Sequence, residues 1–242
     1  MHSLRKENKT ALITGAGRGI GAATAELFAS KNINVILVSK TELELKKVEA
    51  KIKSLYPNIQ TLIFAANLAE ENEVLSLFET IQVKFGSLDI LVNNAGLFRA
   101  APIEEMSLKL WQEVFAVNVN AMFLCSREGF KLMKNNQGGV ILNISSLAGI
   151  RGQIKFPGTA AYAASKNAVI GLTEVMAVEG KPYNVRVNCL APGAVNTKML
   201  REAAPHLSSK TNPEDVAKLI ANLCEDSSAI LNGSVLEVFS NE

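Results

Sequence analysis

Histidine is almost absent from this chain of 242 residues, which contains only His2 and His206. Two histidines are too few for a multi-histidine metal site, and a Ser-His-Asp hydrolase would depend on His206 alone. The three cysteines, Cys125, Cys189 and Cys224, are far apart and form no CxxC pair, so we interpret them as small buried thiols. Any chemistry must come from other side chains, and we expect no metal.

An excess of charge of one sign is also lacking, because 25 basic residues face 23 acidic ones and the formal net charge is +2. This balance gives no electrostatic reason to expect nucleic acid or an anionic membrane as a partner. The apolar runs, such as residues 35–38, have strand length and fall far short of the roughly 20 residues that cross a membrane. No secretory apolar segment follows the N-terminal cations, so we expect a cytoplasmic protein.

Apolar residues are plentiful, at 48% of the chain, and they occur in strand-length runs that alternate with helix-length amphipathic stretches. Near the start of the second such stretch, Thr41 and Glu44 have the spacing of a capping box. The alternation predicts an α/β fold, with one domain built on a doubly wound parallel sheet of seven strands and helices on both faces. We predict strands over 9–14, 34–39, 61–65, 88–92, 140–144, 185–190 and 234–239, and helices over 19–30, 41–56, 70–85, 108–133 and 160–179 and from 212.

A glycine-rich turn follows the first predicted strand and opens the first predicted helix, with the sequence Thr14-Gly15-Ala16-Gly17-Arg18-Gly19-Ile20-Gly21. Glycines let the backbone N–H groups approach a pyrophosphate, and the helix N-terminus supplies partial positive charge. A glycine triplet alone is compatible with an ordinary tight turn. Its position between a strand and a helix favours dinucleotide binding.

The residues at the end of the second predicted strand indicate which dinucleotide the chain binds. An acidic side chain there would hold the adenosine ribose hydroxyls, but the sequence has Ser39-Lys40-Thr41, with no carboxylate before Glu42. Arg18 and Lys40, together with the Ser39 hydroxyl, would form a pocket for a 2′-phosphate. The alternative is that both cations are solvated surface charges. We therefore expect NADP(H) in preference to NAD(H), with NAD(H) left open.

Tyr162 and Lys166 are four residues apart on a predicted helix and therefore share a face. A phenol has a pKa of about 10. A neighbouring ammonium lowers that pKa by stabilising the phenolate, which makes tyrosine a usable acid or base. Ser145 and Ser146 follow a strand, at the edge where open α/β sheets form their sites. Asn118 lies inside a predicted helix, where asparagine is unfavourable unless it has a partner or faces solvent.

Five short segments of the chain occur in the order, and near the spacing, that is typical of one protein family. They are TGAGRGIG at 14–21, NNAG at 93–96, NISS at 143–146, YAASK at 162–166 and APG at 191–193. Over nearly its whole length the chain resembles the classical short-chain dehydrogenase/reductase family. The resemblance implies a single NAD(P)-binding Rossmann domain over 1–242, a small substrate lid around 195–209 and a homotetramer or homodimer.

The resemblance also implies roles for particular residues. Tyr162 matches the general acid/base, and Lys166 matches the residue that lowers the tyrosine pKa and binds the nicotinamide ribose. Ser146 matches the serine that holds the substrate oxygen, and Asn118 the asparagine that holds a water in the proton relay. Besides Tyr162 and Lys166, the residues implied for the cofactor are Thr14, Gly15, Gly17, Arg18, Gly19, Ile20, Gly21, Ser39, Lys40, Asn67, Leu68, Asn93, Ala95, Gly96, Pro192, Gly193, Val195 and Thr197.

The chain departs from the family pattern at three places. Asn67 stands where many relatives have an aspartate that meets the adenine, so a charge is lost while hydrogen bonding is kept. The interval from Ser146 to Tyr162 is longer than usual and carries Arg151, Lys155, Phe156 and Pro157. The sequence ends at residues 240–242 without the closing glycine pair and tail that often contribute to subunit contacts.

The implied reaction is hydride transfer between the nicotinamide and a small-molecule carbonyl or secondary alcohol, with Tyr162 moving the proton. Within the family, a 3-oxoacyl-carrier-protein reductase is one alternative, and it would need a basic surface near the pocket, for which the candidates are Arg127, Lys131, Lys134 and Lys181. A non-catalytic NADP(H)-binding regulator is a second alternative. The pocket is expected to be largely apolar, lined by Leu97, Phe98, Ile150, Ile154, Phe156, Met199, Leu200, His206 and Leu207.

Overall fold

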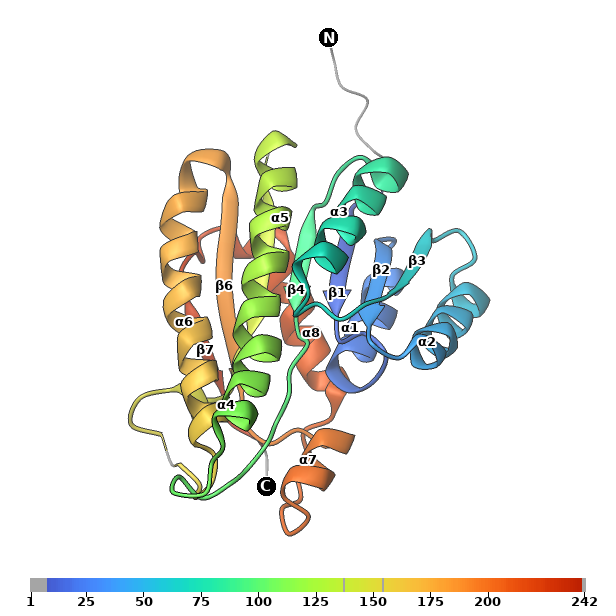
Figure 1. Ribbon diagram of the computed structural model, residues 1–242. Helices are drawn as coiled ribbons and strands as arrows, with labels where there is room; N and C mark the ends of the chain where they lie inside the picture. Colours follow the sequence, from blue (N-terminus) through green and yellow to red (C-terminus); the bar gives the residue numbers. More distant parts are fainter. Residues whose placement is uncertain (1–7, 137, 154, 241–242) are drawn as a thin grey trace.

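The computed structural model describes residues 8–136, 138–153 and 155–240, and its centre is a sheet of seven parallel strands in the order β3-β2-β1-β4-β5-β6-β7 (Figure 1). Every strand register is parallel, so the predicted parallel seven-stranded sheet is confirmed. The ends of each strand lie within two residues of the predicted ends, which is the usual uncertainty for such boundaries. The strands are β1 (Thr10–Thr14), β2 (Asn34–Ser39), β3 (Thr61–Ala65), β4 (Ile90–Asn93), β5 (Gly139–Ile144), β6 (Val185–Pro192) and β7 (Val235–Val238).

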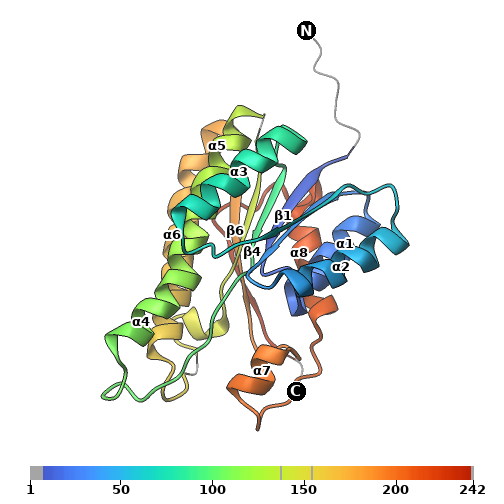
Figure 2. The ribbon, with the colours of Figure 1, turned by 45° about the vertical axis from the view of Figure 1, so that its right-hand side comes forward.

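Helices cover both faces of this sheet, as the alternating elements predict (Figures 1 and 2). One face packs against α1 (Gly19–Ser30), α2 (Glu42–Leu55) and α8 (Pro213–Cys224), and the other against α3 (Glu71–Phe85), α5 (Ala121–Asn135) and α6 (Ala160–Gly180). Successive β1 side chains enter opposite cores: Ile13 joins the α1 side and Leu12 the α3 side, and both are fully buried. The doubly wound, single-domain Rossmann fold follows from this alternation.

The long helical region predicted over 108–133 is confirmed, and it contains one π-helical turn between two α-helices. The first is α4 (Leu108–Phe115), the turn covers Ala116–Asn120, and α5 follows directly. The turn contains Asn118, which is 2% exposed and bonds to a segment far away in the sequence. A π turn inside a helix is often found at a functional site, because it changes the direction of one side chain.

The capping box predicted at Thr41 is wrong. Thr41 is the N-cap residue of α2, but its side chain accepts no capping hydrogen bond. Its backbone N–H donates to Ser39 Oγ at 3.3 Å, so the expected bond to Glu44 is not made. The Glu44 carboxylate instead forms an ion pair with Arg18, with Nη1 and Oε1 3.2 Å apart.

The expected lid region lies between β6 and α8 and contains the short helix α7 (Lys198–Ala203), seen at the lower edge of the molecule in Figure 1. Two hydrogen bonds close its base: Asn196 N–H donates to Thr211 O at 2.8 Å, and Ser209 Oγ donates to Ala194 O at 2.7 Å. In the described ranges no helix is long and apolar enough to cross a membrane.

Candidate active site

The predicted site residues gather at one edge of the sheet, because the carboxyl ends of parallel strands share that edge (the lower edge in Figure 1). The covering helices run back in the opposite direction, so the starts of α5 and α6 lie there too and bring Asn118, Tyr162 and Lys166 to it. The other predicted residues follow or end the strands: Thr14 to Gly21 at β1, Ser39 and Lys40 at β2, Asn67 and Leu68 at β3, Asn93, Ala95 and Gly96 at β4, Ser146 at β5, and Pro192, Gly193, Val195 and Thr197 at β6.

The glycine turn between β1 and α1 has the shape that a bound pyrophosphate requires. Gly15 and Gly19 have φ angles of 65° and 57°, in the left-handed region that favours glycine. A Cβ atom on Gly21 would lie 2.3 Å from the carbonyl oxygen of Gly15, so only glycine allows this close packing. No side-chain hydrogen bond caps the N-terminus of α1. The turn therefore presents backbone N–H groups at a helix N-terminus, which fits the phosphates of a dinucleotide.

Asn94 holds this turn in place, and the sequence analysis did not single it out. Its Nδ2 donates to Thr14 O at 3.0 Å and to Gly15 O at 3.3 Å. The hydroxyl of Thr14 in turn accepts from the backbone N–H groups of Asn94 and Ala95, each at 3.0 Å. The only available signal was its position next to Asn93 in the segment that follows β4.

The side chain of Asn93 points into the protein. It is 4% exposed, and its Nδ2 donates to Ser126 Oγ at 2.8 Å and to Asn143 Oδ1 at 2.9 Å. Asn143 continues the network by donating to Thr173 Oγ1 at 2.9 Å. The amide of Asn93 thus joins β4 and β5 to the helices behind them, and a contact between Asn93 and the cofactor stays a prediction.

The end of β2 contains the predicted cations and one acid that the sequence analysis did not assign to the site. Arg18 and Lys40 are both exposed, and Ser39 is half-buried beside them. Glu44, on the first turn of α2, forms the ion pair with Arg18. Because Glu44 lies 26 residues from Arg18 in sequence, local patterns gave no signal for the pair.

Asn67 lies after β3, where its polar groups bond to the start of α3. Its backbone N–H donates to Glu73 Oε2 at 2.8 Å, and its Oδ1 accepts from Ala69 N–H at 3.3 Å. The Nδ2 group makes a longer bond to Glu70 at 3.4 Å. The adjacent Leu68 is buried. Asn67 therefore shapes the loop, and its contact with an adenine stays a prediction.

Lys166 is fixed within the protein interior at the start of α6. The residue is 4% exposed, and its Nζ donates to Ile144 O, at the end of β5, at 2.8 Å. Ser145 Oγ donates to Lys166 O at 2.7 Å, which ties the same helix to the strand end. A Cβ atom on Gly96 would lie 3.6 Å from both Lys166 Nζ and Asn118 Oδ1. Gly96, Asn118 and Lys166 are therefore neighbours.

Asn118 uses its whole side-chain amide to connect three segments. Its Oδ1 accepts from Leu97 N–H at 2.7 Å, and its Nδ2 donates to Leu97 O at 3.0 Å and to Ser165 Oγ at 2.9 Å. Ser165 Oγ donates to Tyr162 O at 2.7 Å. Asn118 thus positions the loop after β4 against the helix that bears Tyr162. The water-holding role implied by the resemblance stays a prediction.

Tyr162 is half-buried, and its ring packs edge-on against Phe98 with centroids 5.0 Å apart. Burial raises the pKa of the Tyr162 phenol, and a hydrogen bond from Ser146 acts in the lowering direction. Lys166 Nζ is 5.8 Å from the Tyr162 ring centroid and is bound to Ile144. The ammonium bonds to the Ile144 carbonyl and not to the phenol, so its effect on the tyrosine pKa stays a prediction.

Burial also acts on Lys166 itself and lowers the pKa of its ammonium to about 8. The site therefore contains a cation with little solvent beside a phenol that is hard to ionise, and a serine hydroxyl within hydrogen-bonding reach of that phenol. A bound molecule that hydrogen-bonds to both the Tyr162 phenol and the Lys166 ammonium would change the pKa of each group. Such an arrangement suits proton transfer to or from an oxygen atom held between Ser146 and Tyr162.

The structure describes most of the residues predicted to line the substrate pocket. Leu97, Phe98 and Ile150 are half-buried near the site, whereas Phe156 is 56% exposed and Ile154 lies outside the described residues. The expected lid region reaches the glycine turn, since a Cβ atom on Gly19 would lie 3.4 Å from the Thr197 methyl carbon. Four residues predicted to line the pocket from this region are exposed or half-buried: Met199, Leu200, His206 and Leu207.

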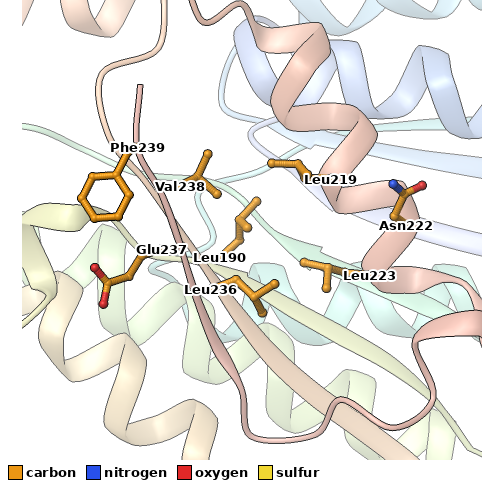
Figure 3. Close-up of a pocket in the computed structure, with 8 residues that line it drawn as sticks. All are labelled: Leu190, Leu219, Asn222, Leu223, Leu236, Glu237, Val238 and Phe239. Atoms are coloured by element: carbon orange, nitrogen blue, oxygen red, sulfur yellow. The ribbon is translucent and has the colours of Figure 1, made fainter. Parts of the chain in front are cut away.

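A hollow lies at the free edge of the sheet and contains none of the predicted site residues (Figure 3). Leu236 and Val238 of β7 point toward Leu219 and Leu223 of α8, whereas Phe239 points to the other side of the strand. It is lined by Leu190, Leu219, Asn222, Leu223, Leu236, Glu237, Val238 and Phe239. Within the described ranges, no cluster of three or more metal-binding side chains occurs.

Comparisons with known proteins agree with this geometry. A family model described as short chain dehydrogenase matches residues 9–208. The chain is 34% identical to a 3alpha-hydroxysteroid dehydrogenase of Mediterraneibacter gnavus, with 96% of each chain covered, and 35% identical to a 3-oxoacyl-(acyl-carrier-protein) reductase of Thermotoga maritima, with 97% of this chain and 98% of that protein covered. Among solved structures, levodione reductase superposes with a TM-score of 0.88 at 28% identity and 95% coverage of each chain.

Proposed function

This chain belongs to the short-chain dehydrogenase/reductase family, and from that premise we propose that it interconverts a carbonyl group and a secondary alcohol with NADP(H) as the redox partner. The family consists of NAD(P)(H)-dependent oxidoreductases that act on small molecules. The observation that carries the proposal is the convergence of Ser146, Tyr162, Lys166 and Asn118 beside the glycine turn.

In the proposed reaction, the bound nicotinamide supplies or accepts the hydride. The Ser146 hydroxyl holds the substrate oxygen next to the Tyr162 phenol, and the phenol donates a proton to that oxygen during reduction or accepts one during oxidation. Lys166, fixed by Ile144 O, keeps a positive charge near the phenol. Asn118 and Ser165 hold the backbone of Tyr162 in position, so the Tyr162 phenol does not have to reorient before it transfers the proton.

We further propose that the cofactor lies along the carboxyl edge, from the loop after β3 to the loop after β6. The glycine turn holds the pyrophosphate, as its φ angles and close packing allow. Lys166 and Tyr162 hold the nicotinamide ribose, and Pro192, Gly193 and Thr197 border the nicotinamide. Arg18, Ser39 and Lys40 supply two cations and a hydroxyl for a 2′-phosphate, which is the basis for preferring NADP(H).

A carrier-protein reductase is a second candidate, favoured by the Thermotoga maritima relative named above. Three of the four candidates for a basic surface near the pocket lie away from the site. Lys131, Lys134 and Lys181 lie at the end of α5 and after α6, and therefore at the amino edge of the sheet, opposite the site. Arg127 pairs with Glu71 and Glu128. The substrate panel should therefore contain 3-oxoacyl thioesters alongside hydroxysteroid ketones and simple alicyclic ketones.

The test is the Tyr162→Phe variant, assayed for NADPH consumption with that panel. Because the phenol proton is lost, we expect the rate to fall about 10²- to 10⁴-fold, the usual contribution of a general acid. NADPH binding, followed by fluorescence, should weaken by no more than about tenfold, since only one neutral hydrogen bond to the ribose is lost. Tyr183→Phe is the matched control, since Tyr183 packs against Lys134 at the opposite edge and should retain wild-type activity.

Full activity of Tyr162→Phe would contradict the assigned mechanism. Tight NADPH binding by the wild-type protein without turnover of any ketone would instead favour the non-catalytic regulator.

A further inference from the structure

Glu44 lies where the sequence predicts a pocket for a 2′-phosphate. A Cβ atom on Gly17 would lie 2.9 Å from Glu44 Cβ, 3.1 Å from Glu44 Oε2 and 3.2 Å from Ser39 Oγ. The absence of a side chain at Gly17 therefore lets the first turn of α2 and the end of β2 contact the glycine turn directly. The Glu44 carboxylate is an acid beside the predicted phosphate-binding hydroxyl.

The carboxylate also binds the first of the two predicted phosphate-binding cations. Arg18 Nη1 donates to Glu44 Oε1 at 3.2 Å, and the side chains are 55% and 33% exposed. A phosphate at Arg18 would place a second anion near the carboxylate. Because a guanidinium has five N–H donors, it has room for both anions, but the two anions repel each other.

Lys40 differs from Arg18 in this respect. Of the residues in ranges 8–136, 138–153 and 155–240, none forms an ion pair with the Lys40 ammonium. A 2′-phosphate would therefore meet the ammonium of Lys40 and a guanidinium, that of Arg18, which is already paired with Glu44.

Resting on the NADP(H)-dependent function proposed above, we propose that Glu44 determines cofactor selectivity. Its carboxylate competes with the 2′-phosphate for Arg18, and it holds the preference for NADP(H) over NAD(H) below the level that Arg18 and Lys40 alone would give. NAD(H) has no 2′-phosphate to bind Arg18, so the Glu44 carboxylate does not compete with it and does not lower its affinity.

The experiment measures the dissociation constants of NADP⁺ and NAD⁺ by calorimetry for the wild-type protein, Glu44→Gln and Glu42→Gln. Since exposed ion pairs contribute up to roughly 1 kcal/mol, we expect Glu44→Gln to tighten NADP⁺ binding about fivefold and to change NAD⁺ binding less than twofold. The gain should shrink at high salt, which screens the repulsion between carboxylate and phosphate.

Glu42→Gln is the matched control, because it removes the same charge from the same helical turn. Glu42 pairs with Lys46 at 2.8 Å and not with Arg18, so both affinities should stay within twofold. In an Arg18→Gln background, Glu44→Gln should no longer tighten NADP⁺ binding, because the shared partner is gone.

Three results would overturn the inference. Unchanged NADP⁺ affinity in Glu44→Gln would show that the carboxylate does not compete, and a selective loss of NAD⁺ affinity would show that it holds a ribose hydroxyl. A wild-type protein that binds neither dinucleotide would overturn the proposed function as well, so the two failures are distinguishable.

Discussion

At the scale of single residues, the site depends on a charge that folding disfavours. Lys166 is 4% exposed, and burial lowers the pKa of its ammonium from 10.5 to about 8. At pH 7 the ammonium is charged in both the folded and the unfolded chain, so the folded state bears the full desolvation penalty. Above pH 10.5 the amine is neutral in both states and this penalty disappears.

Lys166→Met should therefore make the protein more stable while making it less active. After allowance for the lost bond to Ile144 O, we expect the free energy of unfolding at pH 7 to rise by roughly 1–3 kcal/mol. The gain should shrink as the pH rises from 8 toward 10.5, because the wild-type lysine loses its proton in the folded state first.

Guanidinium unfolding at pH 7 and pH 10 measures this difference, with the exposed Lys47→Met as the control that stays within about 0.5 kcal/mol. A Lys166→Met protein less stable than wild type at pH 7, or a gain that does not depend on pH, would contradict the account.

At the scale of helices and strands, two N-cap residues that look alike in sequence should differ in their contribution to stability. Ser107 Oγ accepts a hydrogen bond from Leu110 N–H at 3.2 Å at the start of α4, whereas the side chain of Thr41 accepts none at the start of α2. Ser107→Ala should lower the free energy of unfolding by about 1 kcal/mol, and Thr41→Ala by only a few tenths. Chemical denaturation of both variants tests this, and equal losses would show that the cap geometry does not decide the cost.

The sequence predicted the type and order of nearly all elements, because apolar runs and the glycine turn are local patterns. It did not predict the π turn, since the partner of Asn118 is Leu97, 21 residues away, and no helical period encodes that contact. The failed capping box has the same cause, because Glu44 bonds to Arg18 on another element. Tertiary contacts overrode the local preference in both cases.

At the scale of the whole molecule, a buried polar network joins two central strands of the sheet to a helix behind the site. Asn143 is fully buried, accepts from Asn93 Nδ2 and donates to Thr173 Oγ1, both at 2.9 Å, and so links β4 and β5 to α6. Asn143→Ala would remove one hydrogen bond from each partner in the core and leave a cavity there, so we expect a loss of roughly 2–4 kcal/mol.

The exposed Asn136→Ala is the control for Asn143→Ala and should cost about 0.5–1 kcal/mol, since its amide donates to Leu132 O at the surface. Thermal or guanidinium unfolding measures both variants. A loss at Asn143 no larger than that at Asn136 would show that the network does not couple the strands.

The location of the candidate site was predictable, and its internal bonds were not. Parallel strands place every strand end at one edge, so a site at that edge follows from the order of the elements, whereas most of its individual residues were implied by the family resemblance. The partners of Lys166, the orientation of Asn93 and the acid beside Arg18 depend on distances between elements. Those distances are set by packing, which the sequence patterns do not specify.

The most direct test of the central claim follows deuterium from NADPH labelled at the nicotinamide C4 into the product alcohol by mass spectrometry, with the ketone panel as acceptors. The account predicts one deuterium on the carbinol carbon with the wild-type protein and a loss of the labelled product in Tyr162→Phe. No labelled alcohol from any ketone, or equal labelling by Tyr162→Phe, would contradict it.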